Sequence, residues 1–447
     1  MKRIVFMAMA MLVLLSLTAG CNQKPPMEVI TNDNEEEETQ ATKDGTEAEV
    51  IETKLNSIVY PDVVDFSNEE MMEYLEANEV DEGTVDAVSE FSVRSSAVLL
   101  GGESGNTCYS PLSLYMALAL LSTGAEGETQ DELLALLGEE DAAVLSEQMG
   151  KLYRTMYRDT ENSTFIMTNS LWMNGEYEFN EEFVGNAMDN FYAAANTLDF
   201  SDEGSADVLT DWISDNTNGL LKPKFTIDPM DLMYIINTVY LKDEWTESFD
   251  EELTKEDVFK KADGSEVLTD FMRNNIDAQV IYGNGFTAVT LYLRSTGNMT
   301  FVLPDEGVDL SELLSSTETI ASMTDKDNAE YAMVNLSLPK FSFESEFNLK
   351  QALMDLGVNK VFSMGEADLG GIIDQQAYVS SVKQGTDITV NENGLEAAAY
   401  TKVDIALTAA YTDNEPIVMT FDRPFLYLVQ SRSGVPVFVG SVQNPAN

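Results

Sequence analysis

One segment near the C-terminal end of the chain combines the pattern of a strand with the composition of a loop. Between residues 395 and 407, alternate side chains are small or apolar: Leu395, Ala397, Ala399, Thr401, Val403, Ile405 and Leu407. This period of two is typical of a strand with one buried face. The same stretch follows Gly394 and contains three consecutive alanines, which is typical of a mobile loop or a weak helix. The pattern therefore indicates a segment with two conformations, although an ordinary edge strand would show the same alternation.

The residues around this segment carry three motifs in a fixed order. The first is ENGLEAAA, made of Glu392, Asn393, Gly394, Leu395, Glu396, Ala397, Ala398 and Ala399. The others are FDRPF at residues 421–425 and VGSVQNP at residues 439–445. In order and spacing, these motifs resemble the reactive-loop hinge and the C-terminal end of the serpins, a family of serine protease inhibitors. Leu395 stands where the hinge usually has threonine, but it is uncharged and fits an inward position.

Further matches extend the resemblance from about residue 84 to residue 447. They are SPLS at residues 110–113, NTVYLKDEW at residues 237–245, LPKF at residues 338–341 and ADLGGI at residues 367–372. The resemblance implies that Ser110, Ser113 and Asn237 belong to the shutter, beneath the gap that opens in the central sheet. It implies that Trp245 belongs to the breach, where the reactive loop enters, and that Gln384 replaces a shutter histidine. Plain packing or helix capping would also explain these residue types.

The composition excludes several classes of protein. The chain of 447 residues has 25 basic and 78 acidic residues, a formal net charge of −53, so we expect no nucleic-acid partner. It contains no histidine, which excludes Ser-His-Asp and Cys-His catalysis and histidine-ligated zinc or haem. A hydrolase that uses carboxylates alone passes this test, and so does a calcium site, although the sequence has no DxDxDG loop. We expect no catalytic residue, no metal and no cofactor; the chain is not expected to be an enzyme.

The N-terminal end carries a targeting signal. Lys2 and Arg3 precede an apolar run over residues 4–17, and small residues precede Cys21. This pattern resembles the bacterial lipobox, so we expect residues 1–20 to be a lipoprotein signal peptide and Cys21 to be lipidated; a simple secretory signal peptide is the alternative. Residues 21–65 are mostly acidic and polar, which predicts a disordered tether. We expect the remaining residues, 66–447, to form a domain held at the cell surface by a lipid anchor in a bacterial membrane.

Apolar patterning predicts a mixed α+β domain. Ser110 is expected to cap a helix, and Thr129 and Glu132 are expected to form a capping box for the next one. The second half of the chain alternates like strands, with a nearly continuous apolar strand at residues 235–241 and a hairpin at residues 425–439. The resemblance implies a serpin-like fold with a large central mixed β-sheet, additional sheets, helices and an exposed reactive loop.

The resemblance also implies a suicide inhibitor of serine proteases. A protease cleaves the loop and forms an acyl-enzyme, which is trapped as the cut loop inserts into the central sheet. The family's spacing from Gly394 places the reactive bond between Thr408 and Ala409, and a shift by a few residues is left open. Small residues there suit elastase-like proteases, whereas Leu407 or Tyr411 would suit subtilisin-like, chymotrypsin-like or papain-like enzymes.

Other functions remain open at this stage. A non-inhibitory serpin could act as a surface binding protein, and the signal region alone would allow a solute-binding lipoprotein. The partners that we expect are a target serine protease, or a cysteine protease, and the membrane through the lipid anchor. We expect the protein to be a monomer.

Overall fold

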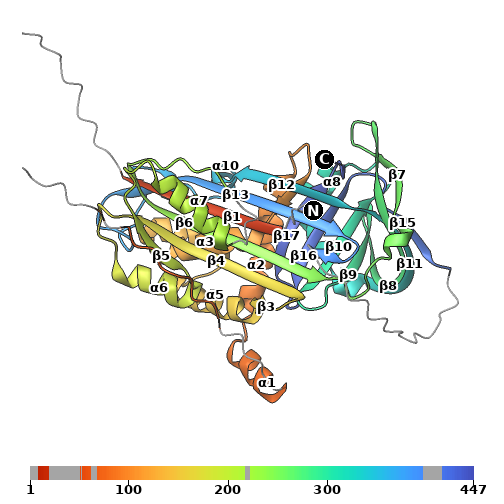
Figure 1. Cartoon of the computed structure of the whole chain (residues 1–447), viewed down its shortest axis with the longest axis horizontal. Helices are drawn as coiled ribbons and strands as arrows, with labels where there is room; N and C mark the ends of the chain where they lie inside the picture. Colours follow the sequence, from red (N-terminus) through yellow and green to blue (C-terminus); the bar gives the residue numbers. More distant parts are fainter. Residues whose placement is uncertain are drawn as a thin grey trace, which may run out of the picture.

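The computed structural model describes residues 9–19, 51, 53–61, 68–216, 222–395 and 415–446. Two large β-sheets and the helices around them form a mixed α+β fold, as the patterning predicted (Figure 1). One apolar core joins both sheets to the helices. A smaller cluster around Trp172 packs beneath α7 (Ser205–Asn216).

The central sheet is built around long strands, and its middle strand is buried on both faces. The middle strand β6 (Asp231–Glu244) is buried at every position from 231 to 241, which fits the apolar strand predicted there. Around it the sheet contains β1 (Met9–Ala19), β13 (Ala377–Asn391), β14 (Gly394–Leu395), β4 (Ser163–Asn174) and β3 (Arg158–Asp159), with β12 (Phe341–Asn348) beside β13 and β5 (Ala194–Leu198) beside β4.

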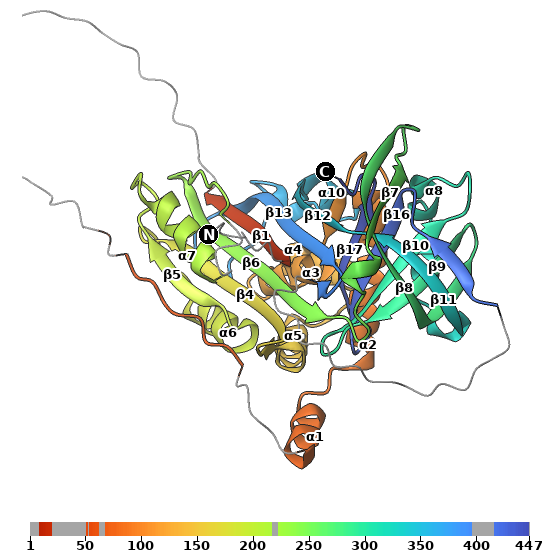
Figure 2. The ribbon, with the colours of Figure 1, turned by 45° about the vertical axis from the view of Figure 1, so that its right-hand side comes forward.

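Strand β1 lies between β13 and β6 and runs antiparallel to both (Figures 1 and 2). Leu15 and Leu17 are fully buried in the main core. The Ser16 hydroxyl lies 2.6 Å from that of Ser380 and 2.8 Å from that of Ser381, on β13. The apolar run that predicts a leader therefore forms a sheet strand in the full-length chain; its removal stays a prediction.

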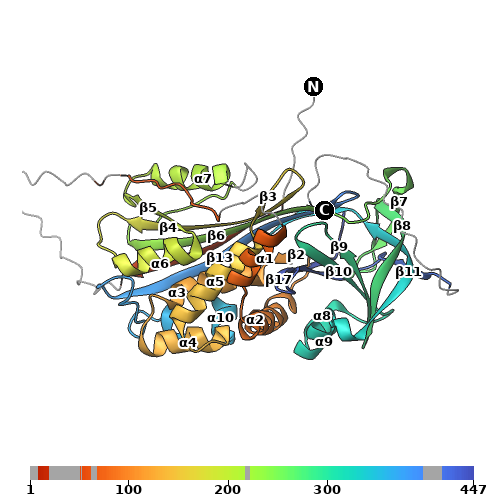
Figure 3. The ribbon, with the colours of Figure 1, turned by 90° about the horizontal axis from the view of Figure 1, so that it is seen from below.

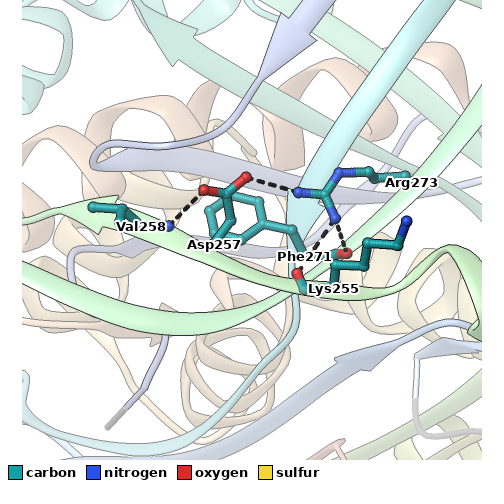
Figure 4. A network of polar contacts seen from close by, with 5 residues as sticks. All are labelled: Lys255, Asp257, Val258, Phe271 and Arg273. Atoms are coloured by element: carbon teal, nitrogen blue, oxygen red, sulfur yellow. Dashed lines mark hydrogen bonds and ion pairs between the residues drawn. The ribbon is translucent and has the colours of Figure 1, made fainter.

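The second sheet forms the other half of the molecule (Figure 2). Its strands are β15 (Ile417–Thr420), β11 (Ala329–Pro339), β8 (Glu266–Gly283), β9 (Phe286–Tyr292), β10 (Gly297–Pro304), β16 (Phe425–Ser431), β17 (Pro436–Val442) and β2 (Thr107–Tyr109), with β7 (Lys255–Lys260) beside β8. Arg273 of β8 ties β7 to β8. It forms a 2.8 Å ion pair with Asp257 of β7 and donates to the carbonyls of Lys255 and Phe271 (Figure 4).

Helices cover the central sheet from both sides (Figure 3). α3 (Pro111–Ser122) lies under the sheet, and every one of its residues is buried, whereas α7 lies on the opposite face. The helices on the side of α3 include α2 (Glu82–Leu100), α4 (Gly127–Leu137), α5 (Ala142–Met156), α6 (Glu181–Phe191) and α10 (Lys350–Asp355). α3 therefore forms the floor beneath the middle of the sheet.

The predicted capping box at Thr129 and Glu132 is wrong. α4 begins at Gly127, so both residues lie inside the helix, and both serve other segments. The Thr129 hydroxyl accepts a hydrogen bond from the Asp368 amide (3.0 Å), and the Glu132 carboxylate accepts from the amides of residues 359 and 360 (2.7 and 2.8 Å). The side chains of Thr129 and Glu132 therefore accept hydrogen bonds from segments distant in the sequence and not from the first turn of a helix. Ser110 caps α3 as predicted, accepting from the Ser113 amide at 3.2 Å.

Part of the predicted tether contacts the domain. Lys54 exchanges backbone hydrogen bonds of 3.0 and 2.9 Å with Thr197 on β5, and Tyr60 stacks on Tyr157 with 5.6 Å between ring centroids. The part of the expected tether that is described, residues 51 and 53–61, thus lies along the edge of the domain. α1 (Asn68–Ala77) follows it. No helix within the described ranges is long and apolar enough to cross a membrane.

Candidate functional site

The candidate site is the space between β13 and β6, called here the central gap. At one end of it, Leu395 of β14 pairs with Val390 of β13 and with Asp243 of β6. Further along, β1 fills the same space, and Val13 pairs with residues of both neighbours. β14 and β1 run in the same direction, antiparallel to β13 and β6. The central gap is therefore one strand wide, and the hinge enters it in the direction that β1 follows.

The residues predicted for the shutter meet across the middle of the central gap. Gln384 of β13 and Asn237 of β6 are both partners of Val13, so they face each other with one strand between them. Beneath them, the Gln384 carboxamide accepts from the Ser110 amide (3.1 Å) and donates to its carbonyl (3.0 Å). The Ser113 hydroxyl donates to the Asn237 side chain. All four residues are at most 1% exposed, and the structure brings them together; their role as a shutter stays a prediction.

Asn169 of β4 also belongs to this cluster, although the sequence reasoning missed it. The Asn237 side-chain N–H donates to Asn169 Oδ1, and Asn169 Nδ2 donates to the backbone carbonyl of Phe191 at the end of α6. A buried hydrogen-bond network of this kind ties β13, α3, β6 and β4 into one unit. A run of three polar residues at 168–170, in the middle of a strand with apolar residues on both sides, was the signal that could have revealed it.

Trp245 anchors the hinge end of the central gap, as the resemblance implied. Its side chain is 1% exposed, and its indole N–H donates to the Asn391 carbonyl at 3.0 Å. Its backbone amide donates to the Asn393 carbonyl at 2.9 Å. Both acceptors lie within the three residues before Gly394, so Trp245 fixes the backbone where the hinge leaves β13.

Glu392 clamps the hinge from the other side. Its carboxylate lies 3.0 Å from the Lys340 ammonium and accepts from the Thr254 hydroxyl at 2.8 Å. Burial alone would raise the pKa of Glu392, but hydrogen bonds from its own amide, Lys340 and Thr254 outweigh that effect and hold the pKa below its ordinary value. Lys340 lies in the predicted LPKF motif, but its ion pair with the hinge was not predicted.

Gly394 is required by a close approach of two backbones. Its φ of 154° and its position leave no room for a side chain, because a Cβ atom would overlap the Asp243 carbonyl. Asp243 itself is fully buried, and its carboxylate accepts from the amides of Ser295 and Thr296 at 2.9 and 2.6 Å. Leu395 is fully buried as well, so leucine fits the inward hinge position. Asp243 was not predicted as a site residue.

The other predicted site residues cannot be placed. The hinge residues Glu396, Ala397, Ala398 and Ala399, the reactive bond Thr408–Ala409 and the lipidation site Cys21 lie outside the described residues.

The arrangement suits a mechanical role. Within the described ranges, the Ser113 hydroxyl is held by Asn237, and burial raises the pKa of the Cys108 thiol to about 12, so neither is an activated nucleophile. The central gap instead presents two strand edges whose backbone groups accept one further antiparallel strand.

Comparisons with known proteins agree with this fold and site. Residues 86–445 match the family model described as serpin, serine protease inhibitor. Serpin-Z2A of Triticum aestivum is 31% identical over 365 residues, which cover 76% of this chain and 90% of the relative. The native crystal structure of tengpin, a thermophilic serpin, superimposes with a TM-score of 0.73 at 25% identity, covering 86% of this chain and 97% of tengpin. Human thyroxine-binding globulin in complex with its ligand is similar in fold alone, with a TM-score of 0.72 at 21% identity. The match covers 82% of this chain and 100% of that protein.

A mixed sheet with a one-strand gap, a buried polar shutter and a clamped hinge defines a serpin-type protein. The family match over residues 86–445 shows that the chain belongs to the serpins. The predicted α+β serpin fold is thus confirmed.

Proposed function

We propose that the protein inhibits serine proteases by inserting its cleaved reactive loop into the central gap. The observation that carries the proposal is the pairing of Leu395 with both β13 and β6, which starts the loop in the direction of an inserted strand. After cleavage, the residues beyond Leu395 would continue this strand and carry the acyl-linked protease with them. Distortion of the protease would then prevent hydrolysis of the ester.

The register of the neighbouring strands supports this proposal. In an unbroken antiparallel pairing, each step forward from Leu395 is one step back from Val390 along β13. Ala399 would therefore face Thr386, which pairs with Met11 of β1. Thr401 would take the place of Val13, between the polar shutter residues. The small residue Ala399 thus lies beside Thr386, and the polar residue Thr401 lies between the polar side chains of the shutter.

The apolar part of the loop fits the apolar part of the gap. Counted along β6 from the pair of Leu395 and Asp243, Val403 and Ile405 would face the partners of Leu15 and Leu17, which are both fully buried. Burying each such side chain contributes about 1.5–3 kcal/mol, and each added ladder hydrogen bond about 0.5–1.5 kcal/mol net. No proline lies between residues 394 and 416, so no ladder donor is missing. The sequence therefore gives the loop a driving force for insertion.

Processing at the N-terminus would make the gap available. We propose that residues 1–20 are removed as a lipoprotein signal peptide, that Cys21 is lipidated, and that the protein is displayed on a bacterial membrane at the cell surface. Removal of residues 1–20 would take β1 out of the central gap. The acidic segment after Cys21 would then hold a monomeric domain away from the membrane, with the reactive loop accessible to proteases.

The proposed reactive bond is Thr408–Ala409. Small residues on both sides suit a protease with a shallow pocket, and the absence of Lys and Arg from residues 403–415 disfavours trypsin-like targets. We propose an elastase-like or subtilisin-like serine protease as the target. No enzymatic activity of the chain itself is proposed.

A second candidate is a non-inhibitory serpin that acts as a surface binding protein. The fold similarity to human thyroxine-binding globulin, whose crystal structure is a complex with its ligand, supports keeping this candidate.

The two candidates are separated by incubating the chain lacking residues 1–20 with a panel of serine proteases. The inhibitor forms a covalent complex that survives denaturing electrophoresis, and cleavage of its loop strongly raises its melting temperature. A non-inhibitory serpin is cleaved without either effect, and that result would overturn the proposal.

A further inference from the structure

A cavity of about 440 Å³ lies beside Trp245. This volume is within the range of small-molecule sites in proteins, about 300–1,000 Å³. Its walls come from both halves of the fold: the end of β6, the strands β8, β9 and β10, and the turn between β16 and β17. Its lining residues include the buried Trp245 and, on one face of the sheet, Asp277, Tyr292 and Asn298.

One buried polar group in this wall lacks a partner. Asn298 is only 6% exposed, and its side-chain oxygen accepts no hydrogen bond from the described residues. A buried acceptor without a donor costs about 1–3 kcal/mol, so a ligand that supplies an N–H or O–H group would relieve that cost. The unpaired Asn298 oxygen therefore points to a ligand with a hydrogen-bond donor.

The rim of the cavity contains two carboxylates that no cation neutralises. Glu247 and Asp277 both line it, and neither makes an ion pair or a side-chain hydrogen bond with the described residues. Partial burial and the charge of Asp277 raise the pKa of Glu247, so the two carboxylates repel each other. Lys326 and Arg432 also lie on the rim, but neither contributes to that shift. This end of the cavity thus favours an added positive charge.

We propose that this cavity binds a small organic cation with an aromatic or other apolar body and a second N–H donor. The ammonium group would lie between Glu247 and Asp277, the apolar body would lie beside Trp245, and the second donor would reach Asn298. The exposed ring of Tyr292, at 40% exposure, lies beside the acidic rim and can contact the cation with its face. The proposal stands independently of protease inhibition.

Tryptamine is a suitable probe, because it has an indole N–H and an ammonium group. We expect saturable 1:1 binding of tryptamine to the full-length chain in isothermal titration calorimetry. Indole-3-propionate, which has the opposite charge, should bind at least tenfold more weakly. 1-Methyltryptamine lacks the indole donor and should bind about twofold to tenfold more weakly.

The variant series tests the assigned positions. Glu247→Gln should weaken tryptamine binding about threefold to fivefold, as expected for a partly exposed charge pair, and the double variant with Asp277→Asn should weaken it further. Glu256→Gln removes an equal charge from an exposed position on β7 outside the cavity and should change nothing. All these positions are on the rim or surface, so the variants should fold.

The pH dependence gives a second readout. Affinity for tryptamine should fall as the pH drops through the raised pKa of Glu247, because protonation removes the charge that the ammonium meets. In Glu247→Gln that pH dependence should be reduced. Absence of saturable tryptamine binding, equal binding of the anionic analogue, or unchanged affinity in both Glu247→Gln and the double variant would overturn the proposal.

Discussion

A charge at residue 403 should convert the proposed inhibitor into a substrate. In the proposed register, Val403 takes the place of Leu15, which is fully buried in the main core. Val403→Glu loses valine burial of about 1.5–3 kcal/mol and buries a carboxyl group without a partner, at about 1–3 kcal/mol. The inserted state should thus lose about 2.5–6 kcal/mol. If half of this loss is present in the transition state of insertion, insertion slows about tenfold to more than a hundredfold.

The assay measures how many molecules of the variant are consumed for each protease molecule inhibited. Cleavage at the reactive bond should continue, but most cleaved loops should release active protease. Val403→Leu is the matched control, because the same position already holds Leu15 in β1, and it should inhibit like the wild type. A normal yield of covalent complex from Val403→Glu would refute the assigned register, and so would loss of complex in Val403→Leu.

Three further predictions concern the hinge, the clamp and the anchor. Ala399→Glu and Ala397→Arg should each lower the yield of covalent complex on denaturing gels, since both positions face inward in the alternation; undiminished inhibition by both would contradict that facing. Glu392→Gln should destabilise the native domain by about 1 kcal/mol at neutral pH, an estimate discounted because the Lys340 side chain is 38% exposed. The folded pKa of Glu392 is lowered, so its contribution to the stability of the folded domain is fully present above the unfolded pKa. That contribution is lost as the pH falls through the folded pKa. The unfolding midpoints of the wild type and the variant should therefore converge in acid. Cys21→Ala should release exported protein from the membrane fraction without abolishing inhibition, and an unchanged membrane fraction would refute the lipobox interpretation.

Motifs located the hinge and the shutter because these residues meet strict local demands. Gly394 is needed where a Cβ atom would overlap a neighbouring carbonyl, and Ser110 caps a helix through a contact three residues away. Gln384 was placed by spacing alone and is indeed bonded to the backbone of Ser110. A close backbone approach or a helix cap restricts the residue type at one position, so the motif can be recognised in the sequence.

Contacts between distant segments left no comparable signal. The ion pair of Glu392 joins residues separated by more than fifty positions, and Asp243 is held by the amides of residues 295 and 296. Thr129 and Glu132 fit a capping box by local spacing, but loops from elsewhere in the chain supply their donors. Local pattern rules cannot choose between near and distant partners.

The N-terminal apolar run shows a different limit. A short, continuously apolar segment fits both a leader and a strand buried on both faces, and periodicity does not separate the two. Residues 9–19 fit the leader pattern in sequence and form β1 in the full-length chain. The proposed processing at Cys21 would remove that strand.

The most direct test is mass spectrometry of the chain lacking residues 1–20 after reaction with an elastase-like protease. We predict a covalent adduct of protease with the fragment that ends at Thr408, together with a released peptide that begins at Ala409 or within a few residues of it. Complete cleavage at this position with fully active protease and no adduct would contradict the proposed inhibition.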